Sequence, residues 1–189
     1  TTTFGLMIKH FGVKTSSVAQ EKLMSKIQKF RSKIDNFFGW VKVTELVELD
    51  NIDVSEDPVR PELDVTWRTT YGRKIYGLKY KDDIEGIICI AYTNDIPSSL
   101  KELDLMSQNA HLQNNANTAV AYTVWSRKRG AGKEIIGKVG DMMKATDNIK
   151  TLVTLSPLTP MATHFHIRNG AKQIAINSTT QNFKYDLSK

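Results

Sequence analysis

A basic turn that carries two glycines has the residue types needed to bind an anionic ligand. Residues Arg127 to Gly132 read R-x-x-G-x-G, and Lys133 follows them directly. Small residues allow several main-chain N–H groups to point at one anion beside a helix N-terminus. The pattern therefore predicts a phosphate site; the alternative is a basic turn whose glycines only permit tight packing. The residues expected to hold phosphate are Arg127, Lys128, Arg129, Gly130, Ala131, Gly132 and Lys133.

A serine and a histidine further along the chain form a second candidate group. Ser156 ends a stretch that predicts a strand, and His166 falls in the short helix predicted after it. Both side chains could face one opening beside the basic turn. A Ser-Pro pair is also typical of a simple turn, and such a histidine is often structural. His164 lies on a different helix face from His166, and no Cys, Asp or Glu grouping completes a metal site, so we expect no metal.

The elements that must position these residues follow from the hydrophobic periodicity. The last third of the chain alternates between strand and helix patterns, which predicts an α/β core. Asn169-Gly170 is typical of a helix stop, because glycine tolerates the left-handed conformation. The predicted elements are strand 118–125, helix 133–145, strand 150–155, helix 162–169 and strand 171–177.

The preceding residues predict a hairpin and an acidic loop. Residues 73–80 and 84–93 read as two strands joined by the short polar turn 81–83, which favours antiparallel pairing. Alternation over residues 40–49 predicts a further strand. The acidic, proline-interrupted residues 51–62 predict a loop that separates the first part of the chain from the rest.

Two helices complete the predicted elements. A helix is expected over 98–106, followed by an exposed Asn/Gln-rich loop up to residue 117. Apolar residues at three- to five-residue spacing over 17–38 alternate with lysines, which predicts an amphipathic helix. Its apolar face either packs on the domain or meets a membrane surface or a partner.

Composition is that of an ordinary globular protein. The 189 residues are 40% hydrophobic and 24% charged, and no apolar run approaches the roughly 20 residues of a membrane helix. We expect one domain over 1–189, in which 1–66 precede a core over 67–189. The single cysteine, Cys89, lies in an apolar run and is expected to be buried. One cysteine and the absence of a secretory signal pattern favour the cytoplasm. The net charge of +6 favours an anionic partner, but no nucleic-acid-binding pattern is present, so nucleic acid is not expected.

A strand, an R-x-x-G-x-G turn and a helix, in this order, resemble the region with which the GNAT superfamily binds the pyrophosphate of coenzyme A. From about Lys74 to Asn177 the chain is also similar to the catalytic domain of malonyl-CoA decarboxylase, itself a GNAT-like fold. Four blocks in the family's order carry this resemblance: residues 84–99, residues 119–137, VTLSPLTP over 153–160 and FHIRNGA over 165–171.

The resemblance implies a GNAT-like acyl-CoA N-acyltransferase fold of the α/β (α+β) class, with a mixed central sheet flanked by helices. It implies that a CoA thioester, malonyl-CoA or acetyl-CoA, is the substrate. In the family's reaction carbon dioxide leaves the malonyl group, and an acid protonates the enolate that remains, with no metal required. At the matching positions His166 would supply or manage the proton. The Ser156 hydroxyl would hydrogen-bond the malonyl carboxylate or assist that transfer.

The same resemblance assigns residues to coenzyme A. In GNAT-like folds the strand before the turn lines the pantetheine arm with its main chain, which implicates Val124 and Trp125. The turn from Arg127 to Lys133 would bind the pyrophosphate. Asn177 matches the family's Ile-Asn pair and would reach the site.

The sequence departs from the family at three places. Only nine residues separate Ser156 from His166, where the family carries a long, largely helical insertion. Ser178 replaces the family's tryptophan, and Arg127-Lys128-Arg129 replaces its glutamine-containing turn. No counterpart of the family's N-terminal helical domain is visible. The resemblance therefore describes a distant, minimal homologue.

Two other functions remain open. A GNAT N-acetyltransferase, which moves acetyl from acetyl-CoA to an amine, would share the fold and the turn. It also needs a general base, and the core strands offer no obvious carboxylate cluster. A non-catalytic CoA-binding or interaction module would bind the same ligand without turnover. Acyl-CoA is the expected partner in each case, and each function allows a homo-oligomer.

Overall fold

The computed structural model describes residues 23–30 and 42–188, which fall into two units divided between Val43 and Thr44. In the first unit, residues 23–30 are helical, in agreement with the helix predicted over 17–38. The remainder of that predicted helix lies outside the described residues. That residues 1–189 form one domain stays a prediction.

The second unit is built on a mixed eight-stranded sheet. Its path runs in the order β1-β2-β3-β4-β5-β8-β6, and β7 pairs with β8 beside that path. Every pairing is antiparallel except β4 with β5. The strands are β1 (Glu45–Glu48), β2 (Lys74–Tyr80), β3 (Asp83–Thr93), β4 (Thr118–Ser126), β5 (Thr151–Thr154), β6 (Ser156–Pro157), β7 (Lys172–Ile176) and β8 (Thr180–Tyr185).

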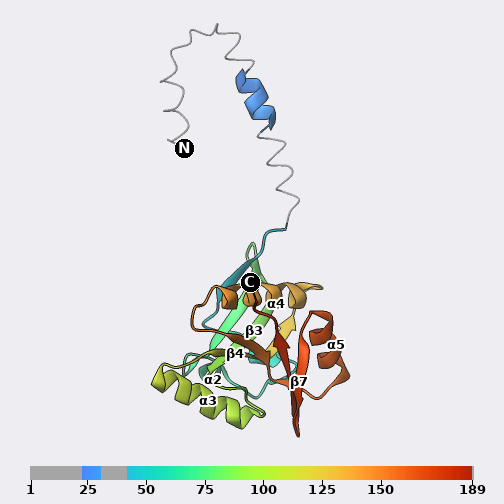
Figure 1. Ribbon diagram of the computed structural model, residues 1–189. Coiled ribbons are helices and arrows are strands. Elements are labelled where there is room, and N and C mark those ends of the chain that lie inside the picture. The colour runs from blue at the N-terminus through green and yellow to red at the C-terminus, as the bar shows by residue number, and fades with distance from the viewer. Residues whose placement is uncertain (1–22, 31–41, 189) are drawn as a thin grey trace. The chain divides into compact units, whose positions relative to one another are not determined.

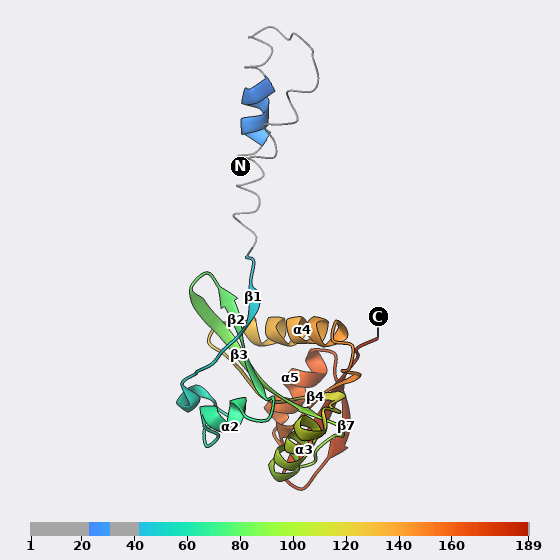
Figure 2. The same cartoon turned by 90° about the vertical axis from the view of Figure 1, so that its left-hand side faces the viewer.

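Helices cover both faces of this sheet, as Figures 1 and 2 show. Adjacent residues of β3 serve opposite cores: Ile88 packs with the apolar side of α4, whereas Ile87 packs with Leu103 of α3. This alternation is the two-residue period of a strand buried on both faces. The helices are a 3₁₀ turn η2 (Val54–Glu56), α2 (Val65–Thr69), α3 (Leu100–Gln113), α4 (Ala131–Lys144) and α5 (Pro160–Arg168).

The predicted strands and helices of the last third are confirmed to within a few residues, and so is the hairpin. The helix α3, by contrast, extends to Gln113, so the prediction of an exposed loop after residue 106 is wrong for its first residues. Small residues explain the difference, because Ser107 and Ala110 are buried and the Ser107 hydroxyl accepts a bond from Arg73 at 2.9 Å. The polar composition of this segment belongs to the exposed side of a helix.

Four elements have no counterpart in the sequence prediction, namely η2, α2, β6 and β8. Strand β8 reads TQNFKY and is nearly all buried, with β5, β6 and β7 as its neighbours. Its polar side chains are satisfied inside the protein: the Asn182 amide donates to Pro97 O at 3.0 Å and to Thr154 O at 2.9 Å. A hydrophobic pattern could not reveal a strand whose buried side chains are largely polar.

The predicted acidic loop over 51–62 is integrated into the fold. Asp57 and Arg60 are buried, and the Asp57 carboxylate pairs with the Arg68 guanidinium at 2.9 Å. Asp57 Oδ1 also accepts from the hydroxyl of Thr123, on β4, at 2.8 Å. The loop therefore packs against the central strands instead of acting as a spacer.

The strands β4 and β5 separate halfway along the sheet. Cys89 of β3 pairs with Thr123, and Ile90 pairs with Ala121, so Tyr122 is an extra residue of β4. Such a bulge bends a strand. The parallel pairing of β4 with β5 ends where Ala121 meets Thr154. Beyond that point the two strands diverge, and we call the region between them the fork.

Candidate active site

A cavity of about 380 Å³ opens at the fork. Its walls come from β4, from the segment after β5, from α5 and from the loop before α2. Among the described residues that line it, none carries an acidic or basic side chain apart from His166. The lining residues are Pro58, Val59, Ala121, Tyr122, Thr123, Val124, Trp125, Ser126, Gly132, Ser156, Pro157, Thr159, Met161, Ala162, Phe165 and His166.

The structure brings the predicted Ser156 and His166 together at this cavity. Ser156 is held in β6 by pairing with Gln181 of β8, and His166 lies on the inner face of α5. The helix starts where the Thr159 side chain accepts from Ala162 N, with proline at its first turn. The Ser156 hydroxyl lies 2.9 Å from His166 Nε2, and both side chains are buried.

A tyrosine that the sequence analysis missed holds the other side of the imidazole. His166 Nδ1 lies 2.8 Å from the hydroxyl of Tyr185, which comes from β8. The imidazole also stacks on Phe183, with ring centroids 4.9 Å apart. Because no pattern predicted β8, no sequence signal pointed to Tyr185. The ring of His166 is thus fixed on both nitrogens and on one face.

Burial sets the protonation state of this group. It lowers the pKa of His166 from 6.5 to about 4, and it raises the pKa of the Tyr185 hydroxyl well above its ordinary value. Both side chains are therefore neutral at pH 7. A neutral imidazole offers one N–H donor and one acceptor nitrogen, so it can relay a proton between its two partners.

The hydrogen bonds around Ser156 assign a direction to this relay. Ser156 Oγ donates to Thr154 Oγ1 at 3.0 Å. Thr154 Oγ1 also accepts from Phe183 N at 3.2 Å. Because the single hydroxyl proton of Ser156 is donated to Thr154, the serine oxygen is left as an acceptor for His166 Nε2–H. Nδ1 of the neutral imidazole then accepts from the Tyr185 hydroxyl. The network is a directed chain from Tyr185 through His166 and Ser156 to Thr154.

The predicted phosphate turn lies at the N-terminus of α4. Gly130 has a φ of 89° and provides no side-chain cap, whereas Ser99 and Thr159 cap α3 and α5. Ala131 N donates to Lys128 O at 3.2 Å, whereas the N–H groups of Gly132 and Lys133, in the same first turn, have no intrahelical partner and are left for water or an anion. Lys128, Arg129 and Lys133 are exposed around this end.

Arg127 is engaged elsewhere on the surface. Its guanidinium donates to Glu56 with its Nε at 2.7 Å, and its NH2 nitrogen lies 2.6 Å from the same oxygen. The main-chain N–H groups of Arg127 and Lys128 both donate to Glu85 O, at 2.8 and 3.2 Å. These bonds shape the turn but occupy donors that the sequence analysis assigned to phosphate.

The turn and the cavity adjoin each other through Gly132. A side chain at this position would place its Cβ 3.3 Å from the Phe165 ring of α5, so glycine permits the two helices to approach. The predicted residues Val124 and Trp125 also line the cavity, although the Trp125 side chain belongs to the core under α2 and α3. Ala131, the first residue of α4, is buried against Gly86.

The structure does not bring Asn177 to the cavity. Its amide donates to Thr180 Oγ1 at 2.9 Å and to Asn182 Oδ1 at 2.8 Å, next to β8. His111 is exposed, and His10 lies outside the described residues. Cys89 is buried, as expected, and its burial raises the pKa of the thiol to about 11.

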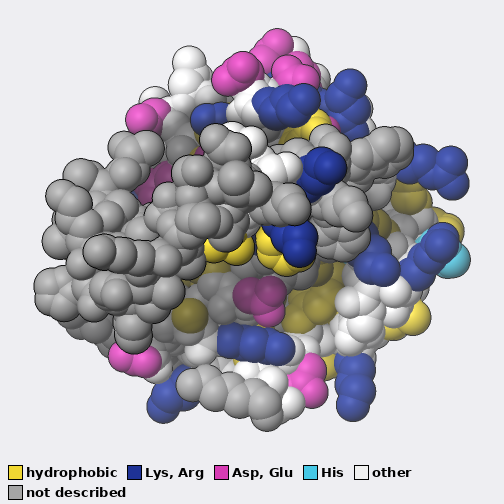
Figure 3. Space-filling view, turned by 90° about the horizontal axis from the view of Figure 1, so that it is seen from above, with side chains coloured by type: hydrophobic (Ala, Val, Ile, Leu, Met, Phe, Trp, Pro, Cys, Tyr) yellow, Lys and Arg dark blue, Asp and Glu magenta, His cyan; other side chains and the backbone are white. Residues whose placement is uncertain are grey.

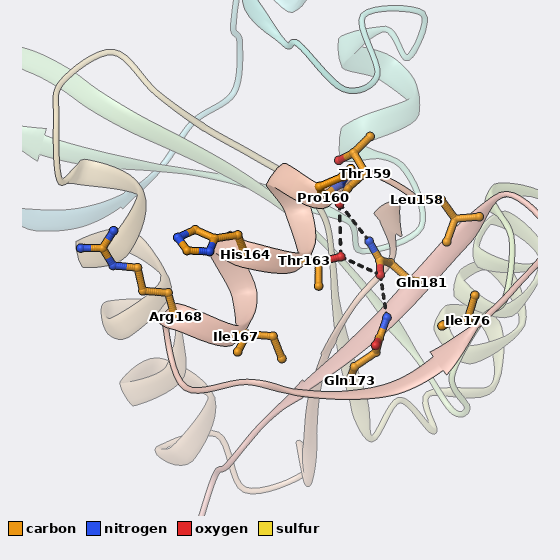
Figure 4. A pocket seen from close by; sticks show the side chains of 10 residues that line it. All are labelled: Leu158, Thr159, Pro160, Thr163, His164, Ile167, Arg168, Gln173, Ile176 and Gln181. Atoms are coloured by element: carbon orange, nitrogen blue, oxygen red, sulfur yellow. Dashed lines mark hydrogen bonds between the residues drawn. The ribbon is translucent and has the colours of Figure 1, made fainter.

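A separate groove of about 810 Å³ lies on the other side of α5, between this helix and β7 (Figure 4). It contains His164, which is exposed, so the two histidines face different openings. Its floor is a set of amides: Gln181 accepts from Thr163 at 3.1 Å and from Gln173 at 2.7 Å. The second histidine therefore takes no part in the Ser156 network.

The charged side chains of the described residues are interspersed on the face shown in Figure 3, where Lys and Arg stand among Asp and Glu. Within residues 23–30 and 42–188, no group of three His, Cys, Asp or Glu side chains is arranged to hold a metal ion. In the same ranges no helix has the length and apolar character needed to cross a bilayer.

The fold is that of the GNAT-like class, as predicted, because solved structures of this class share its arrangement of strands and helices. No protein-family model and no curated protein sequence matches the chain. The malonyl-CoA decarboxylase from Agrobacterium vitis is 22% identical with a TM-score of 0.52, over 64% of this chain and 35% of that one. The enzyme from Rhodopseudomonas palustris is 17% identical with a TM-score of 0.55, over 90% and 63%.

A third structure, the GphF GNAT-like decarboxylase in complex with isobutyryl-CoA, is 12% identical with a TM-score of 0.60. The match covers 76% of this chain and 100% of that one. The chain thus spans about a third of the Agrobacterium vitis enzyme and less than two thirds of the Rhodopseudomonas palustris enzyme. It spans the whole of the GphF decarboxylase structure. At these identities the likeness establishes the fold, whereas the reaction must be argued from the site.

Proposed function

We propose that this protein binds an acyl-CoA and decarboxylates malonyl-CoA to acetyl-CoA with His166 and Ser156. The observation that carries the proposal is the buried hydrogen bond of 2.9 Å between these residues at the wall of an uncharged cavity. Structures of similar fold include two malonyl-CoA decarboxylases and a decarboxylase with a bound acyl-CoA, which adds support.

Coenzyme A would run from the α4 N-terminus into the fork. The N–H groups of Gly132 and Lys133, in the uncapped first turn of α4, would hold the pyrophosphate, with the side chains of Lys128, Arg129 and Lys133 as nearby cations. The exposed main chain of a strand that has lost its neighbour can hydrogen-bond the amides of pantetheine, and Val124 lies on such a stretch. The thioester then enters the cavity.

Loss of carbon dioxide breaks the bond between C2 and the carboxyl carbon, and the electron pair remains on C2 as a thioester enolate. The Ser156 hydroxyl turns from Thr154 Oγ1 and protonates C2. His166 Nε2–H then gives its proton to the serine oxygen, and the Tyr185 hydroxyl gives a proton to Nδ1, so the imidazole stays neutral. One solvent proton restores the tyrosine. The sum is malonyl-CoA and a proton converted into acetyl-CoA and carbon dioxide.

The uncharged walls favour this reaction over acyl transfer to an amine. A carboxylate is costly in an apolar cavity, and decarboxylation removes that charge, so exclusion of water favours the transition state. An N-acetyltransferase needs a base for its amine. No Asp or Glu side chain is among the described residues that line the cavity, and a histidine with a pKa near 4 is a weak base at pH 7.

The test is to incubate the purified protein with malonyl-CoA and with acetyl-CoA, and to follow both thioesters and free CoA by mass spectrometry. Malonyl-CoA should be converted into acetyl-CoA without release of free CoA. His166→Ala and Ser156→Ala should each lose about a hundredfold or more in kcat. Calorimetric titration with CoA should give the same affinity in both variants, because neither residue belongs to the phosphate turn.

His164→Ala is the matched control, since this histidine lies two residues away on the same helix but faces the groove of Figure 4. It should keep the kcat of the unmodified protein. Intact malonyl-CoA together with CoA binding would reject the decarboxylase. Acetyl transfer to an added amine would then identify an N-acetyltransferase, and binding without turnover a non-catalytic module.

A further inference from the structure

Arg60 occupies the point where β4 and β5 diverge. Its side chain reaches from the loop before α2 into the fork, and the residue is only 9% exposed. The guanidinium Nε donates to Tyr122 O at 3.0 Å, and its NH2 group donates to Leu155 O at 3.0 Å. One side chain therefore bridges the main chains of the two diverging strands.

These two carbonyl groups lie just beyond the end of the parallel ladder. The final bond between the strands runs from Leu155 N to Ala121 O at 3.0 Å. Further along, each carbonyl has lost the strand that would have paired with it, and a buried carbonyl without a donor is costly. Arg60 supplies both donors in a fixed planar geometry, which a guanidinium provides and most side chains do not.

Neighbouring charges fix the main chain of Arg60 itself. Its N–H donates to Asp57 Oδ1 at 3.1 Å, and its carbonyl accepts from the Arg68 guanidinium at 2.6 Å. Asp57 and Arg68 are paired with each other and fully buried. The same Asp57 oxygen accepts from Thr123, on the β4 side of the fork. Arg60 is thus held from both sides as it enters the fork.

We propose that Arg60 is a positioning residue for the decarboxylation, which keeps the fork open and places Ser156 against His166. Leu155 directly precedes Ser156, so the bond to Leu155 O fixes the main chain from which the serine side chain extends. The bond to Tyr122 O fixes the opposite wall of the cavity. The proposal rests on the proposed function for its kinetic consequences, whereas its structural content is independent of the reaction.

The test compares Arg60→Met with Arg73→Met. Arg73 is also a buried arginine; it donates to Trp67 O at 2.7 Å and to Asp104 Oδ1 at 2.8 Å, and it does not line the cavity. Both variants lose a buried guanidinium, so both should lose stability. In the folded fraction, Arg60→Met should lose about tenfold or more in kcat on malonyl-CoA, because small displacements of reacting groups are costly. Arg73→Met should retain its kcat.

A conservative variant and a spectroscopic signal separate positioning from general damage. Arg60→Lys has one compact ammonium that cannot reproduce the planar bridge, so its kcat should fall between the methionine variant and the unmodified protein. If Arg60→Met does not fold, this variant is compared with Arg73→Lys instead. The affinity for CoA should fall by a smaller factor than kcat, because the phosphate turn lies outside the fork. The ¹⁵N resonances of the His166 ring should shift only in the Arg60 variants.

The outcomes are distinct from those of the proposed function. Equal kcat values in the Arg60 and Arg73 variants, with unchanged His166 resonances, would overturn the positioning role even in an active enzyme. If the unmodified protein does not decarboxylate malonyl-CoA, the ¹⁵N spectra alone decide. A His166 shift confined to the Arg60 variants then upholds the positioning role while the proposed reaction is rejected.

Discussion

The two halves of the candidate site are built in opposite ways. The phosphate turn is one contiguous, mostly exposed stretch over residues 127–133. The proton-relay group is buried and is assembled from Thr154, Ser156, His166 and Tyr185, which come from different elements. A contiguous motif depends on local conformation, whereas the relay exists only once the sheet and α5 are in place. Local interactions therefore govern ligand capture, and tertiary packing governs the chemistry.

The same contrast separates two consecutive residues, Glu56 and Asp57. Glu56 pairs with Arg127 of the turn at 2.6 Å, and both side chains are more than a third exposed. Asp57 pairs with Arg68 at 2.9 Å with both side chains fully buried. Exposed ion pairs are screened by water and contribute little, whereas an orphaned charge in the interior is costly.

Removal of each carboxylate gives the largest difference between the two regions. Asp57→Ala should lower the free energy of unfolding by about 3–5 kcal/mol, because Arg68 loses its partner and buried donors lose an acceptor. Glu56→Ala should change it by about 1 kcal/mol or less. Urea denaturation at pH 7, followed by far-ultraviolet circular dichroism, measures both values.

Asp57→Asn separates charge from hydrogen bonding in this comparison. The amide keeps an acceptor for Val59 N, Arg60 N and the Thr123 hydroxyl, which Asp57 Oδ1 now serves. Its loss of stability should therefore be smaller than that of Asp57→Ala. If Asp57→Ala and Glu56→Ala lower the free energy of unfolding by similar, small amounts, the buried pair stabilises the protein no more than the surface pair does.

Acid should weaken the interior before it affects the turn. The pKa of His166 is about 4 in the folded protein and 6.5 unfolded, so between these values the unfolded state binds more protons. Stability from this residue is fully present above pH 6.5 and is lost as the pH falls through that window. The pKa difference corresponds to about 3 kcal/mol. Urea midpoints between pH 7 and pH 4 should record the loss.

His166→Gln is the control for this dependence. The variant removes the titrating imidazole, so the decline between pH 6.5 and pH 4 should become shallower, even though the variant is less stable at pH 7. His164→Gln should retain the steep decline, because that histidine is exposed. An identical slope in the unmodified protein and in His166→Gln would assign the acid sensitivity to other groups.

The contrast between the contiguous turn and the relay assembled from distant elements also decides how much of the site the sequence predicts. The order of strands and helices after residue 118 was predictable because β4, β5 and α4 have regular apolar periods. Ser156 and His166 were accessible through a motif resemblance, and the structure places them in contact. The turn was found from its basic residues and two glycines, which are contiguous in the sequence. In each case a short stretch of sequence contained the whole signal.

The missed parts depend on residues whose role appears only in the folded protein. Tyr185 and Asn182 lie on a strand without a hydrophobic pattern, and β8 is a strand because three neighbours pair with it. Arg60 lies in a segment that reads as an acidic loop, yet it spans the fork. Such residues are polar and buried, and local sequence does not indicate which distant carbonyl or imidazole will be their partner.

The smallest expected effects concern the cations of the turn, and they differ in sign. Lys133→Ala should weaken CoA binding about two- to fivefold, as is usual for one exposed charge near a helix N-terminus. Arg127→Ala should weaken it less, because Glu56 already neutralises that guanidinium. Glu56→Gln should strengthen CoA binding by about twofold, since it releases Arg127 and removes a negative charge. Calorimetric titration with CoA measures each affinity.

Salt should remove these differences while it leaves the interior unchanged. At about 0.5 M NaCl the Debye length is only a few ångströms, so the affinities of the three turn variants should converge on that of the unmodified protein. The kcat ratio between Ser156→Ala and the unmodified protein should stay constant over the same range, because that hydrogen bond is buried. Weaker CoA binding in Glu56→Gln, or affinities that do not depend on salt, would contradict this prediction. Either result would mean that the phosphates bind a conformation of the turn that the ion pair between Glu56 and Arg127 holds in place. In that case Arg127 would have to keep its present position to bind, and the turn would depend on tertiary contacts as much as the relay does.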